Sequence, residues 1–188
     1  NWRVDAAVGG ASRAVGDIGS HWCDTLQFVT GKRITKVLAD LSIVWPTRQV
    51  SPSAATFSSA KEGEIREARP VTTEDAASVL IRFEDGSKGC FSVSQVSAGR
   101  KNRLSFEVNG SECSLGWDQE IPQQLWIGHR QQPNQTLTDD PGLMSPAVAG
   151  NTHFPGGHTV GCPDPSTTML HHFSSSVKAC SILPRDCD

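Results

Sequence analysis

The segment AASVLIRFEDGSKGCFSVSQVS (76–97) decides the fold, because it holds two β-prone runs joined by a turn signal. Apolar and polar residues alternate along the runs, which is the pattern of strands with one buried face. Asp85-Gly86 between the runs is typical of a tight hairpin, since glycine adopts the backbone angles that such turns require. The segment therefore predicts two antiparallel strands.

Other β-prone runs lie on both sides of this hairpin: ITKVLADLSIVW (34–45), RLSFEV (103–108), ECSLGW (112–117) and QLWIGH (124–129). Asn109-Gly110 predicts the turn of a second hairpin, whereas residues 46–70, rich in proline, serine and charge, predict a loop. From residue 130 onward the sequence is turn-rich. We expect an α+β fold with a predominantly antiparallel open sheet of roughly four to six strands and helices on one face.

The helix expected on that face is RAVGDIGSHWCDTLQFVTG (13–31). Its buried stripe would consist of residues at helical spacing, namely Ile18, Trp22, Leu26 and Val29. Gly31 stands where a helix commonly stops. Asp17 and His21 are four residues apart, so they share one face of the helix near its N-terminal end.

Composition limits the class of protein. The 188 residues, 37% of them hydrophobic and 20% charged, are typical of a soluble globular domain with its own core. The net charge is -3, and the 17 basic residues are scattered, so no basic stripe is available for nucleic acid. The apolar stretches are far shorter than the roughly 20 residues that span a bilayer. We expect neither a nucleic-acid partner nor a membrane partner.

The cysteines and the first residues bear on the cellular compartment. The 6 cysteines form no CxxC pair, which argues against a zinc or redox motif, and we expect no metal. Free thiols are favoured over disulfides, and residues 1–8 hold no apolar signal block, so we expect a cytoplasmic protein. Since Asn1 is not methionine, we expect the polypeptide to start further upstream.

Five motifs, in order, resemble the C-terminal domain of the Gfo/Idh/MocA oxidoreductases, the relatives of glucose-fructose oxidoreductase and inositol dehydrogenase. They are WRVD (2–5) with Gly9-Gly10, GDIGSHWCD (16–24), EDAASVLIRFEDGSKG (74–89), SAGRKNRLSFEVNGSECSLGWDQE (97–120) and FPGGHTVGCPD (154–164). The second is similar to the family's Asp-x-Gly-x-His pattern. Glu112 and Cys113 depart from the glycine usual in relatives, and the match is poor after Asp164. We expect a substrate-binding and oligomerisation domain over 1–165 and an irregular or truncated tail over 166–188.

The resemblance implies the C-terminal half of a two-domain enzyme. Relatives bind NAD or NADP in an N-terminal Rossmann domain, and their open sheet often forms oligomer contacts. A lysine in a Glu-Lys-Pro motif of that first domain acts with the aspartate and histidine of Asp-x-Gly-x-His. This sequence has neither Glu-Lys-Pro nor a G-x-G-x-x-G after a strand. We therefore expect no cofactor-binding residues in this chain and no activity from the chain alone.

Within that resemblance, His21 and Asp17 are the candidate catalytic residues. Histidine suits a general base because its unperturbed pKa is about 6.5. A neighbouring carboxylate can orient the ring, bind a second sugar hydroxyl or stabilise the imidazolium. The spacing alone favours a different explanation, a helix cap and a surface histidine. The resemblance favours catalysis.

Four further residues are candidate substrate ligands: Arg3, Asp5, His158 and Trp117. Arg3 and Asp5 precede the Gly-Gly turn, and a salt bridge on an edge strand is the alternative role for them. Trp117 has a flat face that stacks well on sugar rings, although it can equally belong to the core. His158 lies in the late Gly-His loop.

The expected function is that of the substrate-binding half of an NAD(P)-dependent oxidoreductase. Its substrate would be a hydroxyl or ketone of a cyclic sugar, an anhydrosugar or a polyol. We expect a small carbohydrate as ligand and a homo-oligomer formed through the open sheet. The alternative is a non-catalytic sugar-binding or oligomerisation module, and the sequence upstream of Asn1 would separate the two.

Overall fold

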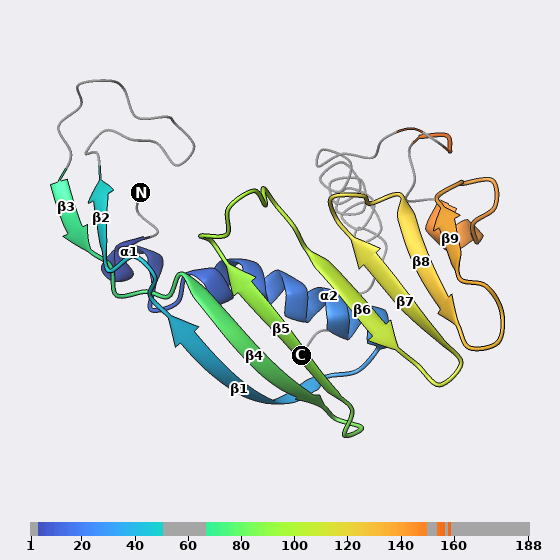
Figure 1. Ribbon diagram of the computed structural model, residues 1–188, viewed down its shortest axis with the longest axis horizontal. Coiled ribbons are helices and arrows are strands. Elements are labelled where there is room, and N and C mark those ends of the chain that lie inside the picture. The colour runs from blue at the N-terminus through green and yellow to red at the C-terminus, as the bar shows by residue number, and fades with distance from the viewer. Residues whose placement is uncertain (1–3, 51–66, 150–153, 157, 159–188) are drawn as a thin grey trace, which may run out of the picture. The chain divides into compact units, whose positions relative to one another are not determined.

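The computed structural model describes residues 4–50, 67–149, 154–156 and 158, which belong to two compact units divided after Lys101 (Figure 1). The first unit contains α1 (Ala6–Gly9), the π-helix η2 (Val15–Gly19), α2 (Ser20–Thr30), β1 (Ile34–Ser42), β2 (Thr47–Val50), β3 (Glu67–Pro70), β4 (Ala76–Phe83) and β5 (Lys88–Ser94). The second contains β6 (Ser105–Asn109), β7 (Cys113–Asp118), β8 (Gln124–His129), β9 (Gln135–Thr138) and α3 (Pro146–Ala149).

The hairpin predicted over 76–97 is the centre of the first unit. β4 pairs antiparallel with both β1 and β5, which gives a three-stranded sheet with β4 in the middle. The turn is closed by the Phe83 N–H, which donates to the Ser87 carbonyl over 2.9 Å. Gly86 has a φ of 86°, a conformation that side chains disfavour, so the turn requires glycine there. The Asp85-Gly86 prediction is confirmed.

The helical segment packs on one face of this sheet and forms the core with it. The buried cluster and the partly buried hydrophobic residues against it are Ala14, Ala77, Val79, Ile81, Phe83 and Val93, with Val15, Ile18, Trp22, Ile34 and Phe91. Trp22 stacks on Phe91 with the ring centroids 4.4 Å apart. The predicted stripe is confirmed for Ile18, Trp22 and the buried Leu26. Val29 is wrongly included, since it is 43% exposed. Helical spacing sets a side chain's direction but not how far the partner surface extends.

Two short strands lie inside the stretch 46–70 that the sequence predicts as a loop. β2 and β3 pair antiparallel as a ribbon of their own, from Thr47 opposite Pro70 to Val50 opposite Glu67. The loop prediction is therefore wrong at both ends of the stretch. These strands are largely exposed, so they show no apolar alternation, and they are defined by pairing with a partner distant in sequence.

The second unit is a four-stranded antiparallel sheet in the order β6-β7-β8-β9. The predicted hairpin is confirmed, and Gly110 donates its N–H to the Cys113 carbonyl over 2.9 Å at the turn. β8 coincides with the predicted strand 124–129. β9 lies in the region expected to be turn-rich, and that expectation is wrong because this exposed strand is defined only by its pairing with β8.

The two hairpins belong to different sheets. Among the described residues, strand pairing joins β4 to β5 and β6 to β7, but it does not join β5 to β6. The chain between them contains several bends, with Gly99 at a φ of 84°. The expectation of a single open sheet is therefore wrong for the described strands, whereas the predominantly antiparallel α+β class with few helices is confirmed.

Within the described part of the chain, Cys23, Cys90 and Cys113 are free thiols, as expected for these three. The other cysteines and the tail 166–188 lie outside the described residues. No helix in the described part is both long enough and apolar enough to cross a membrane.

Two residues of α2 test the packing of the helix on the sheet. Leu26 is 4% exposed and Phe28 is 88% exposed. Truncating a buried leucine costs about 2–5 kcal/mol, because apolar contacts are lost and a cavity remains. We expect Leu26→Ala to lower the free energy of unfolding by that amount, and Phe28→Ala to change it by less than about 0.5 kcal/mol. Urea unfolding of both variants measures the difference, and equal losses would contradict this packing.

Candidate functional site

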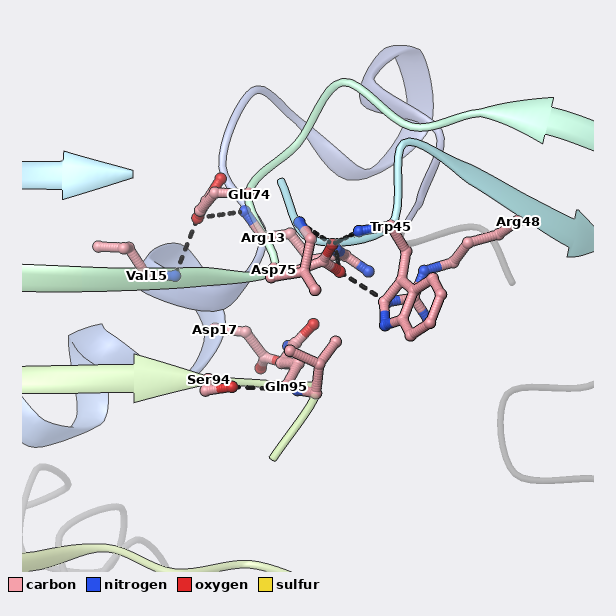
Figure 2. A network of polar contacts seen from close by, with 11 residues as sticks. Arg13, Val15, Asp17, Trp45, Arg48, Glu74, Asp75, Ser94 and Gln95 are labelled. Carbon is pink, nitrogen blue, oxygen red and sulfur yellow. Dashed lines mark hydrogen bonds and ion pairs between the residues drawn. The ribbon is translucent and has the colours of Figure 1, made fainter. Parts of the chain in front are cut away.

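One helical segment carries both candidate catalytic residues. Asp17 lies in η2, is partly exposed, and accepts a hydrogen bond at Oδ2 from Nε2 of Gln95 over 3.4 Å (Figure 2). His21 is exposed in the first turn of α2, which follows η2 directly. The sequence predicted an α-helix here, and the structure begins it with a π-helical turn. Such turns are frequent at functional sites.

Glu74 anchors the start of this segment. Its buried carboxylate oxygen Oε1 accepts the N–H of Arg13 over 2.8 Å and that of Val15 over 2.9 Å. The same oxygen accepts the hydroxyl of Ser12 over 2.8 Å. The first N–H groups of a helix lack partners within the helix, and a carboxylate satisfies them while matching the positive end of the helix. Glu74 therefore determines where the segment with Asp17 begins.

Asp75, the next residue, is completely buried and joins several segments (Figure 2). Its Oδ1 accepts Nη2 of Arg13 and, over 2.6 Å, Nη2 of Arg48. Its Oδ2 accepts the N–H of Val44 over 2.9 Å and that of Trp45 over 2.8 Å. Both oxygens are thus saturated with donors, as a buried charge requires.

These contacts keep both carboxylates ionised. Burial alone raises the pKa of the Glu74 carboxyl, but the hydrogen bonds that it accepts, first that from the Val15 N–H, outweigh burial and lower the pKa below its ordinary value. Burial also raises the pKa of Asp75, and the Trp45 N–H and the Arg13 guanidinium again lower it overall. Groups that hold their charge so firmly serve structure rather than proton transfer.

Gln95 connects this anchor to Asp17. Its backbone N–H donates to the Asp75 carbonyl over 2.9 Å, while its side chain reaches the Asp17 carboxylate. Gln95 is not among the site residues that the sequence predicts. Nothing in its local pattern marks it, because it is one polar residue within the alternating run SVSQV (92–96), and its link to Asp17 spans 78 positions.

Of the two ligand candidates near the N-terminus, the structure describes Asp5. Arg3 lies outside the described residues. Asp5 is the N-cap of α1: its Oδ1 accepts the Ala7 N–H over 3.0 Å. Asp5 therefore precedes a short helix, and the alternative of an edge-strand salt bridge does not match its position. A role for Arg3 or Asp5 in binding substrate stays a prediction.

Trp117 and His158 lie in the second unit. The Trp117 ring packs against Phe106 with centroids 5.8 Å apart, and its Nε1 donates to the Pro122 carbonyl over 3.0 Å. These contacts favour the core alternative for Trp117. His158 is exposed, and its Nδ1 lies 3.1 Å from the Pro155 carbonyl oxygen. Substrate binding by either residue stays a prediction.

The described strands do not form a dinucleotide site of the Rossmann type. The paired strands are all antiparallel, whereas Rossmann-type sites lie at the carboxyl ends of parallel strands, beside a glycine-rich turn. A G-x-G-x-x-G after a strand is also missing from the sequence. Within the described part of the chain, no group of three or more His, Cys, Asp or Glu side chains is arranged to hold a metal ion.

Comparisons with known proteins place these features in a family. The protein-family model of the GFO/IDH/MocA C-terminal domain matches residues 1–116 of this chain. Levoglucosan dehydrogenase of Pseudarthrobacter phenanthrenivorans is 29% identical over 127 residues, which are 68% of this chain and 32% of that protein.

Solved structures with the same fold include an inositol dehydrogenase homolog from Azotobacter vinelandii, complexed with NAD+. It is 26% identical with a TM-score of 0.75, over 95% of this chain and 40% of that one. An oxidoreductase domain protein from Kribbella flavida is 29% identical with a TM-score of 0.75, over 96% of this chain and 45% of that one. The chain thus spans less than half the length of these relatives.

Asp75→Asn tests whether the buried carboxylate holds the segments together. The change removes the buried negative charge and leaves the guanidiniums of Arg13 and Arg48 side by side without it. Removing one partner of a buried ion pair costs about 3–5 kcal/mol. We expect a loss of that size in the free energy of unfolding, measured with urea at neutral pH. A loss below about 1 kcal/mol would show that the pair is dispensable.

Glu74→Gln tests the pH dependence that follows from the lowered pKa. The contribution of Glu74 to stability is fully present above the pKa of the unfolded chain, about 4.3, and is lost as pH falls through the folded value. We expect the variant to be less stable at neutral pH but to lose stability less steeply below about pH 5. Unfolding free energies across that range measure this. Glu107→Gln, which alters an exposed carboxylate of β6, is the control and should follow the wild-type curve.

Proposed function

The chain belongs to the Gfo/Idh/MocA oxidoreductases through their C-terminal domain, and we propose that it is the substrate-binding half of an enzyme that oxidises or reduces a cyclic sugar, anhydrosugar or polyol. One observation carries this proposal. Asp17 and His21 stand on a single helical segment, near its start, and Glu74, which lies just before β4, anchors that start. Both residues are at least partly exposed, as groups that contact a substrate must be.

The chemistry assigned to these residues is proton transfer at a carbinol. In the oxidising direction, the His21 imidazole removes the hydroxyl proton, and the Asp17 carboxylate orients the ring or stabilises the imidazolium that forms. In the reducing direction, the imidazolium returns the proton to the carbonyl oxygen. NAD or NADP, bound outside the described residues, would exchange the hydride.

The relatives support the substrate class and the cofactor. One is named as a levoglucosan dehydrogenase, and levoglucosan is an anhydrosugar. Another is an inositol dehydrogenase homolog with bound NAD+. A ring bearing several hydroxyl groups is common to these substrates, and an aspartate beside the base provides an acceptor for a second hydroxyl.

The open face of the three-stranded sheet supports a homo-oligomer. Leu38, Leu80 and Cys90 lie in register across β1, β4 and β5, with Leu38 69% and Leu80 57% exposed. On one side of this apolar row lies a basic row, formed by Lys36, Arg82 and Lys88. On its other side lies a polar row, formed by Asp40, Ser78 and Ser92. Two copies related by a twofold axis would place apolar row on apolar row and basic row opposite Asp40. The exposed apolar row also favours the alternative function, that of a non-catalytic oligomerisation module.

His21→Ala in the full-length oxidoreductase that carries this chain tests the enzyme proposal. Loss of a general base lowers kcat by about 10²–10⁴-fold, whereas loss of an exposed side chain barely changes stability. Assays with levoglucosan, inositol and other sugars, with both NAD and NADP, measure the effect. If His21→Ala keeps near-wild-type kcat/KM at every pH from about 6 to 9, His21 is not the general base.

Asp17→Asn should lower kcat in the same assay, but less than His21→Ala does, because it removes charge and orientation rather than the base. Its matched control is Asp24→Asn, which alters an exposed carboxylate on the same helix. We expect the control to match the wild-type enzyme. The two effects at the site should combine less than additively, since the residues act as a unit.

Leu80→Glu tests the proposed oligomer contact. A charge in the centre of the apolar row should dissociate the oligomer, as seen by analytical ultracentrifugation of the full-length protein. Val37→Glu is the control, because Val37 is similarly exposed but pairs with Ile81 on the helix-covered face. If both variants keep the wild-type assembly, the open face of this sheet is not the contact.

A further inference from the structure

Gln95 stands where the sheet meets the helical segment with the candidate catalytic residues. It follows directly after Ser94, the last residue of β5, and its amide Nε2 lies 3.4 Å from Oδ2 of Asp17 (Figure 2). We propose that Gln95 is a positioning residue, which orients the Asp17 carboxylate for its work beside His21. This inference rests on the function proposed above for Asp17 and His21.

The backbone of Gln95 is held firmly. Its N–H donates to the carbonyl of Asp75 over 2.9 Å, and Asp75 is itself held by four donors on its buried carboxylate. Directly after Gln95, the Val96 N–H bonds to the Ser94 hydroxyl over 3.2 Å, which bends the chain away from the strand. The amide of Gln95 therefore extends from a base that has little freedom to move.

The chemistry of the contact suits positioning. Only the NH₂ end of a glutamine amide is attracted to a carboxylate oxygen, so the contact determines which way the amide is turned. The amide is neutral, so it orients the carboxylate without pairing off its charge, as an arginine or lysine would. The 3.4 Å separation is long for a hydrogen bond, and bonds around catalytic groups commonly shorten when substrate binds.

The geometry also explains why the contact joins these two residues. Trp22 stacks on Phe91 of β5 one turn of helix beyond Gly19. At Gly19 itself an added Cβ would lie 3.5 Å from the Phe91 ring, so helix and strand run close together there. This packing brings the end of β5 beside η2, and Gln95 is the residue at that end whose side chain contacts Asp17.

Gln95→Met in the full-length enzyme is the central test, because methionine keeps the length of the side chain and removes the donor. A hydrogen bond to a charged group of this kind corresponds to about a tenfold change. We expect kcat to fall about tenfold, while KM and the melting temperature stay near the wild-type values. Gln124→Met, at an exposed glutamine that starts β8, is the matched control and should leave kcat unchanged.

A double-mutant cycle with Asp17→Asn separates positioning from a structural role. If Gln95 acts through the Asp17 carboxylate, Gln95→Met should have no further effect on kcat in the Asp17→Asn enzyme. Gln95→Glu should lower kcat more than Gln95→Met does, because it places a like charge beside Asp17. Effects of Gln95→Met and Asp17→Asn that simply multiply would overturn the proposal.

The failure of this proposal is distinguishable from that of the proposed function. An enzyme impaired by His21→Ala and Asp17→Asn but unaffected by Gln95→Met would overturn the role of Gln95 alone. An enzyme that keeps its activity in both His21→Ala and Asp17→Asn would overturn both. If Gln95→Met lowers the melting temperature, Gln95→Glu takes its place in the cycle. A loss of kcat from Gln95→Glu that disappears in the Asp17→Asn enzyme supports the role of Gln95, and an equal loss in both enzymes overturns it.

Discussion

The first unit depends on one buried charge, the carboxylate of Asp75. A carboxylate removed from water costs several kcal/mol unless donors replace the water, and here each oxygen accepts two hydrogen bonds. The donors come from the residue before the helical segment, from the chain after β1 and from β2. If any of these segments moved away, the buried Asp75 carboxylate would lose hydrogen-bond donors. The helix, the three-stranded sheet and the β2–β3 ribbon therefore depend on one another.

The buried and the exposed ionisable residues of this unit have different roles. Glu74 and Asp75 are adjacent in sequence, buried, and held in the ionised state by donors, so they position backbone. Asp17 and His21 lie on the segment that they hold and remain accessible. The proton transfer that we propose for Asp17 and His21 needs groups that can change charge, and such groups cannot also be the charges on which folding depends. Placing the two sets side by side gives the site a rigid base.

Much of the fold follows from local patterns. The helix, both hairpins and β8 were predictable because each is marked within a few residues, by periodicity or by a turn signal such as Asp85-Gly86. The ribbon β2–β3 and strand β9 were not, because their exposed residues carry no alternation and their strand character comes from the partner. The break between β5 and β6 was also invisible, since turn-prone residues such as Gly99 do not show whether a ladder continues beyond them.

For the site, the sequence by itself determined which residue types share a helix: Asp17 and His21, four apart, within a motif shared with a family of oxidoreductases. It did not determine what surrounds them. Gln95 beside Asp17, the donors around Asp75 and the role of Asp5 as a helix cap were decided only by tertiary structure. The physical reason is range: backbone geometry relates neighbours three or four residues apart, whereas a hydrogen bond across 78 positions exists only after strand and helix have packed.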